Sequence, residues 1–284
     1  MVLASMLNVD LHCHSHFSDG VFAPAELAVR AQAQGVDVWA LTDHDEIGGI
    51  PEARKAASEV GLQFIAGVEI SITWANKTVH IVGLNIDENS TELRQGLASI
   101  KSGRSDRGQE MAAELAKVGI HGAYEGAVKY ADHPASLSRT HFARYIVELG
   151  LHETVGDVFR HYLAEGKPGF VPHRWGTLAN AVKWIHAAGG RAVVAHPGRY
   201  DFNQLALDAM LDEFCSLGGE GIEVVTGSHT PAQYQEFAKV AQHYGLLASR
   251  GSDFHGPEES NYDLGSLPPL PAGLKTIWHD WHSA

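Results

Sequence analysis

Short apolar runs alternate with amphipathic stretches near both ends of the chain. The apolar runs are rich in Val, Ile and Leu, as strands are. The predicted strands cover residues 8–14, 37–43, 63–71, 78–86, 191–197, 221–227 and 246–253. Apolar residues recur with helical period over residues 24–35, 50–61, 177–190 and 231–245, and several of these stretches open on Pro and end on Gly. This alternation predicts βαβ units and a mostly parallel α/β sheet, either closed as a barrel or open and doubly wound.

The middle of the chain has a different pattern. From about Thr91 to Gly176 the periodicity is mainly helical, and no convincing strand interrupts it. We therefore expect a first part of the α/β domain over residues 1–95 and its second part over residues 177–284. Residues 96–176 would form a helical insertion over one mouth of a barrel.

Length and composition limit the class of protein. A chain of 284 residues with 44% hydrophobic side chains can bury a large core in one α/β domain with an insertion. No segment approaches the roughly 18–20 unbroken apolar residues of a membrane span, and the N-terminus lacks a basic start with a long apolar run. We expect a cytoplasmic protein without a membrane partner or an obligate protein partner. Two cysteines, Cys13 and Cys215, are too few for a disulfide framework or a zinc ribbon.

Charge and histidine content narrow the choice further. The formal net charge of −13 argues against a protein that coats DNA without regard to sequence, because that function needs a broad basic face. An anionic substrate would have to be attracted by local positive charge. The chain also has 18 histidines, nearly as many as its 21 lysines and arginines together. Their positions in the sequence therefore deserve more weight than their number.

The segment "VDLHCHSHFSDG", residues 9–20, places histidines at alternate positions. In an extended strand His12 and His14 project from one face, while Cys13 points to the other face and packs. Two imidazoles on one face can chelate a metal, and Asp19 in the following turn can reach back over the strand end. His16 lies beyond the strand and carries less weight.

Other predicted strands also end on potential metal ligands. Parallel α/β barrels gather their catalytic groups at the carboxyl ends of the strands, so these side chains are expected to converge. Asp43 could be a ligand, a partner that orients His44, or a base. The remaining histidines lack such pairing and are interpreted as surface or satisfied core residues. The preferred set contains six histidines and three carboxylates, namely His12, His14, Asp19, His44, Glu69, His80, His196, Asp253 and His255.

Nine ligands are too many for one tetrahedral ion. They suit two or three ions that share a bridging carboxylate. Imidazole and carboxylate without thiolate favour manganese, iron or zinc over copper(I) or an iron–sulfur cluster. Several divalent ions would give the site a local positive charge that can capture a phosphate.

These motifs resemble the polymerase and histidinol phosphatase (PHP) family within the wider amidohydrolase grouping. The resemblance is carried by "DLHCHSHFSDG", "LTDHD", "GVEIS", "HIVGL", "AHPGR" and "GSDFHG", from both ends of the chain. It implies a distorted (βα)7 barrel with three divalent ions, manganese first and iron or zinc as alternatives, that hydrolyses phosphate esters. It implies three ligand sets: His12, His14, Glu69 and Asp253 for one ion; Glu69, His80 and His196 for a second; Asp19, His44 and His255 for the third. Asp19, His44 and His255 are also the candidates for protonating the leaving oxygen.

The insertion resembles the PHP subgroup that acts on nucleoside 3′,5′-bisphosphates and short 5′-phosphorylated oligonucleotides. Arg104 and Arg107 are three residues apart and share a helix face, and guanidinium groups bind phosphate through paired hydrogen bonds. Arg250 also lies near the metal motifs, whereas Arg144 and Arg160 are interpreted as solvated surface charges. The candidate substrate-binding residues are Ser102, Arg104, Arg107, Ser136, Ser138, Arg139, Thr140 and Arg199.

The resemblance therefore implies hydrolysis of the 3′-phosphate of nucleoside 3′,5′-bisphosphates, such as pAp to AMP and phosphate. Trimming of short 5′-phosphorylated oligonucleotides in the 5′ to 3′ direction is a related expectation. A histidinol-phosphate-type phosphatase is an alternative, although a simple monoester needs no second anion site. A noncatalytic metal-binding PHP module is another, although such a module would be expected to lose ligands. An amide hydrolase with a carboxylated lysine is disfavoured, because no lysine is placed at a strand end.

Overall fold

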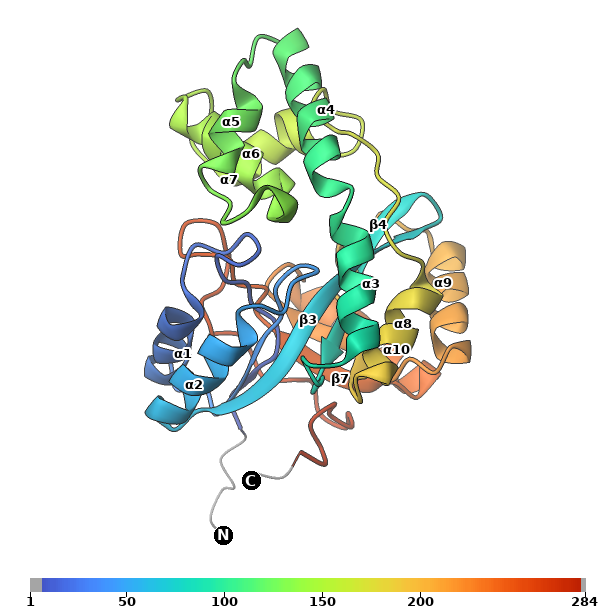
Figure 1. The fold of residues 1–284 in the computed structure, drawn as a ribbon. Coiled ribbons are helices and arrows are strands. Elements are labelled where there is room, and N and C mark those ends of the chain that lie inside the picture. Colours follow the sequence, from blue (N-terminus) through green and yellow to red (C-terminus); the bar gives the residue numbers. More distant parts are fainter. Residues whose placement is uncertain (1–6, 282–284) are drawn as a thin grey trace.

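The structure is a computed structural model that describes residues 7–281. One sheet contains seven strands in chain order. They are β1 (Val9–Asp10), β2 (Val38–Leu41), β3 (Gln63–Trp74), β4 (Lys77–Leu84), β5 (Arg191–Val194), β6 (Gly221–Thr226) and β7 (Leu247–Gly251). The first and last strands meet, because Leu11 N donates to Arg250 O at 3.0 Å and Asp253 N donates to His12 O at 2.8 Å. The fold is thus the expected distorted (βα)7 barrel, nearly closed and surrounded by helices (Figure 1).

Strand β4 is antiparallel to both of its neighbours, β3 and β5, whereas the other pairs are parallel. It follows β3 through a two-residue turn at Ala75 and Asn76, which both have positive φ, the geometry of a tight hairpin. A connection this short cannot return the chain for parallel pairing. The expectation that His80 ends a parallel strand is therefore wrong. His80 lies opposite Ser71 in the first half of β4 and reaches the mouth of the barrel from there.

Helices cover the outside of the barrel, and their apolar faces pack against the strands. The largest core lies between the strands β3, β4, β5 and β6 and the helices that cover them. Residues such as Ile81, Ile185 and Phe214 are fully buried in it. Helix α10 shows why the helices begin and end where they do: Thr230 caps its N-terminus, Pro231 follows, and Gly245 ends it with φ 67°. The barrel helices are α1 (Pro24–Ala33), α2 (Ile50–Val60), α3 (Thr91–Lys101), α8 (Leu178–Ala187), α9 (Gln204–Ser216) and α10 (Pro231–Tyr244).

A second group of helices forms a lobe over one mouth of the barrel (Figure 1). We call it the cap. It has its own apolar core, in which Leu115, Phe142 and Ile146 are buried. Helix α3 packs against the barrel through Leu93 and Leu97. Residue 96, the expected start of the insertion, therefore lies inside a barrel helix. The cap consists of α4 (Arg104–Lys117), α5 (Ala123–Val128), the short helix Pro134–Ser136, α6 (Arg139–Glu148), α7 (Val155–Val158) and the π-helix Phe159–Leu163.

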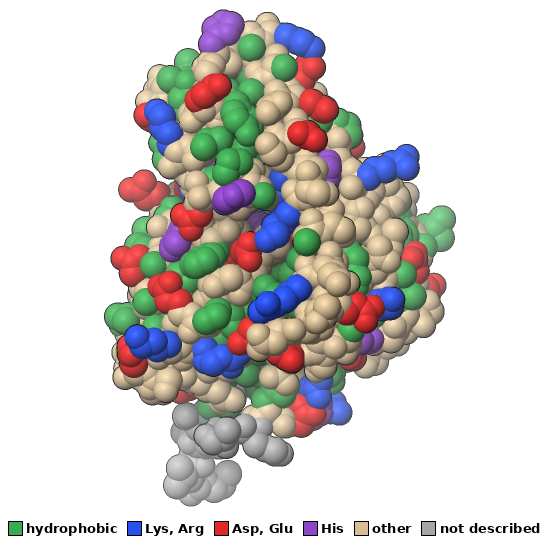
Figure 2. All heavy atoms as spheres, in the orientation of Figure 1, with side chains coloured by type: hydrophobic (Ala, Val, Ile, Leu, Met, Phe, Trp, Pro, Cys, Tyr) green, Lys and Arg blue, Asp and Glu red, His purple; other side chains and the backbone are tan. Residues whose placement is uncertain are grey.

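Basic side chains on the face drawn in Figure 2 lie scattered among acidic ones. This mixture agrees with the net charge of −13 and differs from the broad basic face that coating a nucleic acid requires. Among residues 7–281, none of the helices has the length and apolar character that crossing a lipid bilayer requires.

Candidate metal centre

The nine candidate ligands converge at the mouth of the barrel that the cap covers. Regular pairing of β1 ends at Asp10, but the chain stays extended and Cys13 bridges to Phe254. Cys13 is therefore buried in packing, and His12 and His14 point together to the other side. Their Nε2 atoms lie 3.2 Å apart.

Glu69 lies at the centre of this group. Its Oε1 is 2.8 Å from His80 Nδ1 and 2.9 Å from His196 Nε2. Its Oε2 is 2.8 Å from His44 Nδ1 and 3.3 Å from Nε2 of both His12 and His14. One carboxylate thus faces five imidazoles, as a bridging ligand would.

The ligand atoms form three overlapping groups, and the atoms of each group lie within 4.8 Å of one another. The first group equals one expected ligand set, and the second contains another with His14 added. The third pairs Glu69 and His80 with His44, whereas the expectation pairs them with His196. The groups are His12, His14, Glu69 and Asp253; His14, Asp19, His44 and His255; and His44, Glu69 and His80.

Hydrogen bonds fix which imidazole nitrogens are free to bind a cation. His12 Nδ1 lies 2.8 Å from Glu223 Oε1, and a carboxylate can only accept, so Nδ1 carries the proton and Nε2 of the neutral ring keeps its lone pair. His14 Nδ1 lies 3.4 Å from Ser18 Oγ, whose own proton is donated to Asp43 at 2.6 Å. When both rings are neutral, the two facing Nε2 atoms therefore both carry lone pairs. Beside two carboxylates these lone pairs attract a cation, either a metal ion or the proton that the raised pKa of His14 reflects.

Buried atoms without a hydrogen-bond partner give a second test of fit. In the described part of the chain, four of the seven such atoms belong to candidate ligands: Asp19 Oδ1, His44 Nδ1, Glu69 Oε2 and His196 Nδ1. His44 Nδ1 and Glu69 Oε2 lie 2.8 Å apart without hydrogen-bond geometry, and leaving such atoms unpaired is costly unless an ion occupies the space beside them. Nitrogen and carboxylate oxygen donors of this kind suit divalent cations.

The pKa values reflect the same crowding. Burial and the neighbouring Arg199 lower the pKa of His196 to about 3. Burial also opposes protonation of His14, but hydrogen bonds to Asp253 and Glu69 raise its pKa to about 10. For Glu69, burial raises the pKa, but the surrounding imidazoles, His44 first, outweigh it and hold the pKa well below its usual range. The carboxylates are therefore anionic and need positive charge nearby.

A cluster of arginines, two of them buried and one half-buried, faces the candidate metal centre. We call Arg104, Arg107 and Arg139 the arginine cluster. Together with Asp19, His44, His80 and His255, among others, they line one small pocket of about 100 Å³. The guanidinium groups of Arg104 and Arg107 lie 4.7 and 5.3 Å from the centre of the Trp175 ring.

Two members of the cluster lack an acidic partner. Arg104 pairs with Asp45, but within residues 7–281 no ion pair involves Arg107 or Arg139. Burial and the other arginines lower the pKa of Arg107 to about 9 and that of Arg139 to about 10. Both remain cationic at neutral pH. Buried cations without counter-charges beside an open pocket make an anion site.

Comparison with known proteins agrees with this geometry. The PHP domain family matches residues 10–187. The chain belongs to the PHP domain family. It is 47% identical to a 3′,5′-nucleoside bisphosphate phosphatase of Chromobacterium violaceum over 97% of this chain and 96% of that protein. It is 45% identical to a 5′-3′ exoribonuclease of Haemophilus influenzae over 87% of this chain and 90% of that protein.

A solved structure is equally similar. It is an amidohydrolase from Chromobacterium violaceum with bound sulfate and no metal, with a TM-score of 0.93 at 47% identity over 96% of this chain and 95% of that one. The PHP family of this chain and its barrel architecture are therefore shown by both sequence and structure.

The structure places four residues considered in the sequence analysis of this PHP protein in other surroundings than expected. Ser102 and Ser136 do not line the pocket of the arginine cluster, because their hydroxyls donate to the carbonyls of Ser99 and His133 in their own helical turns. Arg250 is buried, and its guanidinium donates to the carbonyls of Leu267 and Pro268, among others. Ser138, Thr140 and Arg199 do line the pocket.

Arg144 is the fourth such residue, because it is not a solvated surface charge. It donates to Glu259 through two nitrogens at 2.7 and 2.8 Å, and to Asp19 O at 2.6 Å. Its side chain is only 9% exposed. Arg144 therefore fixes the cap to the loop that carries Asp19.

Sequence reasoning missed Glu223 and Trp175 in this PHP protein. Glu223 is the one acidic residue in the apolar run "GIEVVTG", and an acid within a buried strand is a signal that could have identified it. Trp175 gave no comparable signal, because its contact with Arg104 joins distant parts of the chain. Asp43 accepts hydrogen bonds from Ser15 and Ser18, so its carboxylate holds the turn that follows His14.

Proposed function

We propose that this protein is a metal-dependent phosphoesterase that removes the 3′-phosphate from nucleoside 3′,5′-bisphosphates, such as pAp, and trims short 5′-phosphorylated oligonucleotides. One observation carries the proposal. Four of the candidate metal ligands, Asp19, His44, His80 and His255, line the same pocket as the unpaired arginines, so two phosphates on one nucleoside could be held together. The names of the relatives support the same substrates.

The candidate ligands would hold three divalent ions, with manganese first and iron or zinc as alternatives. His12, His14, Glu69 and Asp253 would hold one ion, and Glu69 also belongs to the group with His44 and His80. Bound ions would supply Lewis acidity, which activates water and neutralises charge on the phosphoryl group.

The arginine cluster would grip the 5′-phosphate. Arg107 and Arg139 have no acidic partner in the described chain, so binding a phosphate costs them no existing ion pair. Anchoring one end of the substrate sets the distance to the other end, and this positioning lowers the entropic cost of reaction. The cap, which provides these arginines, would thus act as the specificity element.

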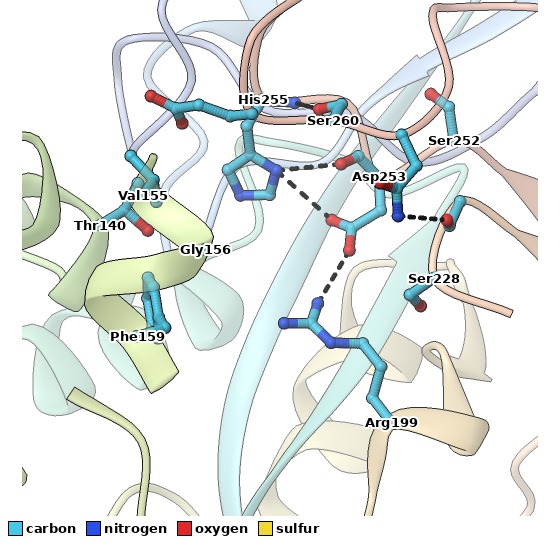
Figure 3. Close-up of a pocket in the computed structure, with 13 residues that line it drawn as sticks. Thr140, Val155, Gly156, Phe159, Arg199, Ser228, Ser252, Asp253, His255 and Ser260 are labelled. Atoms are coloured by element: carbon cyan, nitrogen blue, oxygen red, sulfur yellow. Dashed lines mark hydrogen bonds and ion pairs between the residues drawn. The ribbon is translucent and has the colours of Figure 1, made fainter. Parts of the chain in front are cut away.

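A proton must reach the leaving 3′-oxygen. Asp19, His44 and His255 are the candidates, because all three line the pocket. His255 Nε2 lies 3.3 Å from Asp19 Oδ1, so these two groups could share and transfer a proton. Arg199 donates to Asp253 Oδ2 at 2.9 Å and keeps that carboxylate oriented (Figure 3).

The proposal is tested by metal analysis followed by phosphate release. The substrates are a nucleoside 3′,5′-bisphosphate, its 3′-monophosphate, its 5′-monophosphate and histidinol phosphate. We expect the bisphosphate to have the highest kcat/KM and the 5′-monophosphate to release no phosphate. Preference for histidinol phosphate, or full activity in metal-free protein, would refute the proposal.

A further inference from the structure

A separate pocket lies beside the candidate metal centre, between the cap and the C-terminal loops of the barrel. We call it the side pocket. It has a volume of about 370 Å³ and begins at Asp253 and His255. Figure 3 shows these two residues on one side and Gly156 and Phe159 of the cap on the other. The complete lining is Thr140, Val155, Gly156, Phe159, Arg199, Gly227, Ser228, Ser252, Asp253, His255, Glu259, Ser260 and Asn261.

The charges of the side pocket do not suit a phosphate. Its cation, Arg199, is already bound to Asp253 at 2.9 Å. Its other carboxylate, Glu259, is held by Arg144. None of the three arginines of the arginine cluster lines the side pocket. An anion would therefore gain little there.

The remaining lining suits an uncharged nucleoside. Val155 and Phe159 offer apolar contact, and the Phe159 ring can pack against a base. The hydroxyl of Ser228 and the amide of Asn261 offer hydrogen bonds; Asn261 Nδ2 donates to Gly227 O at 3.3 Å, which leaves its amide oxygen as an acceptor. The volume falls within the range of roughly 300–1,000 Å³ typical of small-molecule sites.

A second recess adjoins the arginine cluster and differs in its neighbours. It has a volume of about 720 Å³, and its lining includes Arg139, Phe170 and His173 but none of the nine candidate ligands. A nucleoside whose 5′-phosphate is held by the arginine cluster can therefore place its base there. The side pocket instead adjoins the point where the 3′-phosphate would be attacked.

Resting on the proposed function, we infer that the side pocket binds the second nucleoside of an oligonucleotide, the one attached to the scissile phosphate through its 5′-oxygen. Cleavage of the bond between phosphorus and the first 3′-oxygen, with water adding to phosphorus and a proton passing to that oxygen, leaves the new 5′-phosphate on the second nucleoside. The pocket thus favours trimming, whereas a nucleoside bisphosphate leaves it free.

Two substitutions from opposite walls can fill the side pocket. A Cβ at Gly156 would have no neighbour closer than 3.7 Å, so the backbone there accepts the Cβ of Gly156→Trp without a clash. Ser228→Trp does the same from the barrel, at an exposed position. Glu153→Trp is the control, because Glu153 is exposed in the loop just before α7 but does not line the side pocket.

The measurement compares a nucleoside 3′,5′-bisphosphate with a 5′-phosphorylated dinucleotide that has the same first nucleoside. Both pocket variants should lose about tenfold or more in kcat/KM on the dinucleotide, mainly through KM, because one stacked base contributes roughly 1–3 kcal/mol. Turnover of the bisphosphate, and both activities of Glu153→Trp, should stay at the level of the parent protein.

The outcomes separate this inference from the proposed function. Equal losses on both substrates, in variants with unchanged metal content and thermal unfolding, would overturn the inference by assigning the pocket to the first nucleoside. Unchanged dinucleotide cleavage in either folded variant would also overturn it. A parent protein that cleaves neither substrate would instead refute the proposed function itself.

Discussion

Glu223 connects two candidate ligands that come from different strand ends. Its Oε1 lies 2.8 Å from His12 Nδ1, and its Oε2 accepts from the backbone nitrogen of His196 at 2.6 Å. Both partners are donors, so the carboxylate of Glu223 orients two ligands at once. Groups that orient a ligand in this way typically affect metal affinity by about 10–100-fold.

We therefore predict that Glu223→Gln weakens metal binding. The amide of Gln can accept only one of the two hydrogen bonds, and its NH2 group would face the other donor. Metal affinity should fall by about 10–100-fold, measured by metal content and by the dependence of phosphate release on manganese concentration. Glu236→Gln, an exposed residue of α10, is the control. Unchanged manganese dependence in Glu223→Gln would contradict the orienting role.

The arginine cluster should determine selectivity for the 5′-phosphate. In Arg107→Met and Arg139→Met, kcat/KM for the bisphosphate should fall by about tenfold or more, because a charge-assisted contact contributes roughly 1.5–3 kcal/mol. Activity on the nucleoside 3′-monophosphate should change little. Arg160→Met serves as the control, since Arg160 is 69% exposed and pairs with Asp157 on its own helical segment. Equal losses on both substrates would argue against a 5′-phosphate site.

Arg144 should stabilise the junction between the cap and the barrel. Arg144→Met leaves Glu259, which is only 14% exposed, without its partner. Breaking a largely buried pair costs about 3 kcal/mol in the free energy of unfolding, which denaturant titration can measure. Arg54→Met is the matched control, because Arg54 pairs with Glu88 but is 50% exposed and should cost less than about 1 kcal/mol. Equal costs for both variants would show that burial does not matter here.

His141 should make stability depend on pH. Burial lowers its pKa to about 4, and its Nδ1 accepts from Ser138 N at 3.1 Å at the start of α6. In the unfolded chain a histidine has a pKa of about 6.5. Between roughly pH 6.5 and 4 the unfolded state therefore binds the proton first, so stability falls as pH falls, by up to about 3 kcal/mol. Above that window the effect is absent.

The substitution His141→Gln tests this prediction. Gln at the same position can accept from Ser138 N without taking up a proton. The loss of unfolding free energy between pH 7 and pH 5 should be smaller in His141→Gln than in the parent. His243→Gln, in the last turn of α10, should leave that loss unchanged. An unaltered pH dependence in His141→Gln would exclude His141 as its source.

The barrel could be predicted from the sequence because its signals are local. Alternation of apolar runs with amphipathic helices reports burial directly, and the spacing of His12 and His14 places both on one face of an extended segment. The motif residues could also be identified, because each follows or interrupts an apolar run. The direction of β4 could not be predicted, because no Gly or Pro marks the two-residue turn at Ala75 and Asn76 between the two strands.

The substrate side depended on contacts that no local pattern records. Arg144 and Arg107 look alike in the sequence, as basic residues of amphipathic helices, yet Arg144 meets Glu259 while Arg107 meets no acid in the described chain. Whether an arginine is neutralised depends on which distant residue packs beside it. The sequence by itself determined which candidate ligands are present and that most of them follow strands, with Glu69 and His80 inside strands as the exceptions. Only the tertiary structure decided which nitrogens remain free and which cations remain unpaired, because hydrogen bonds and ion pairs form between segments brought together by folding.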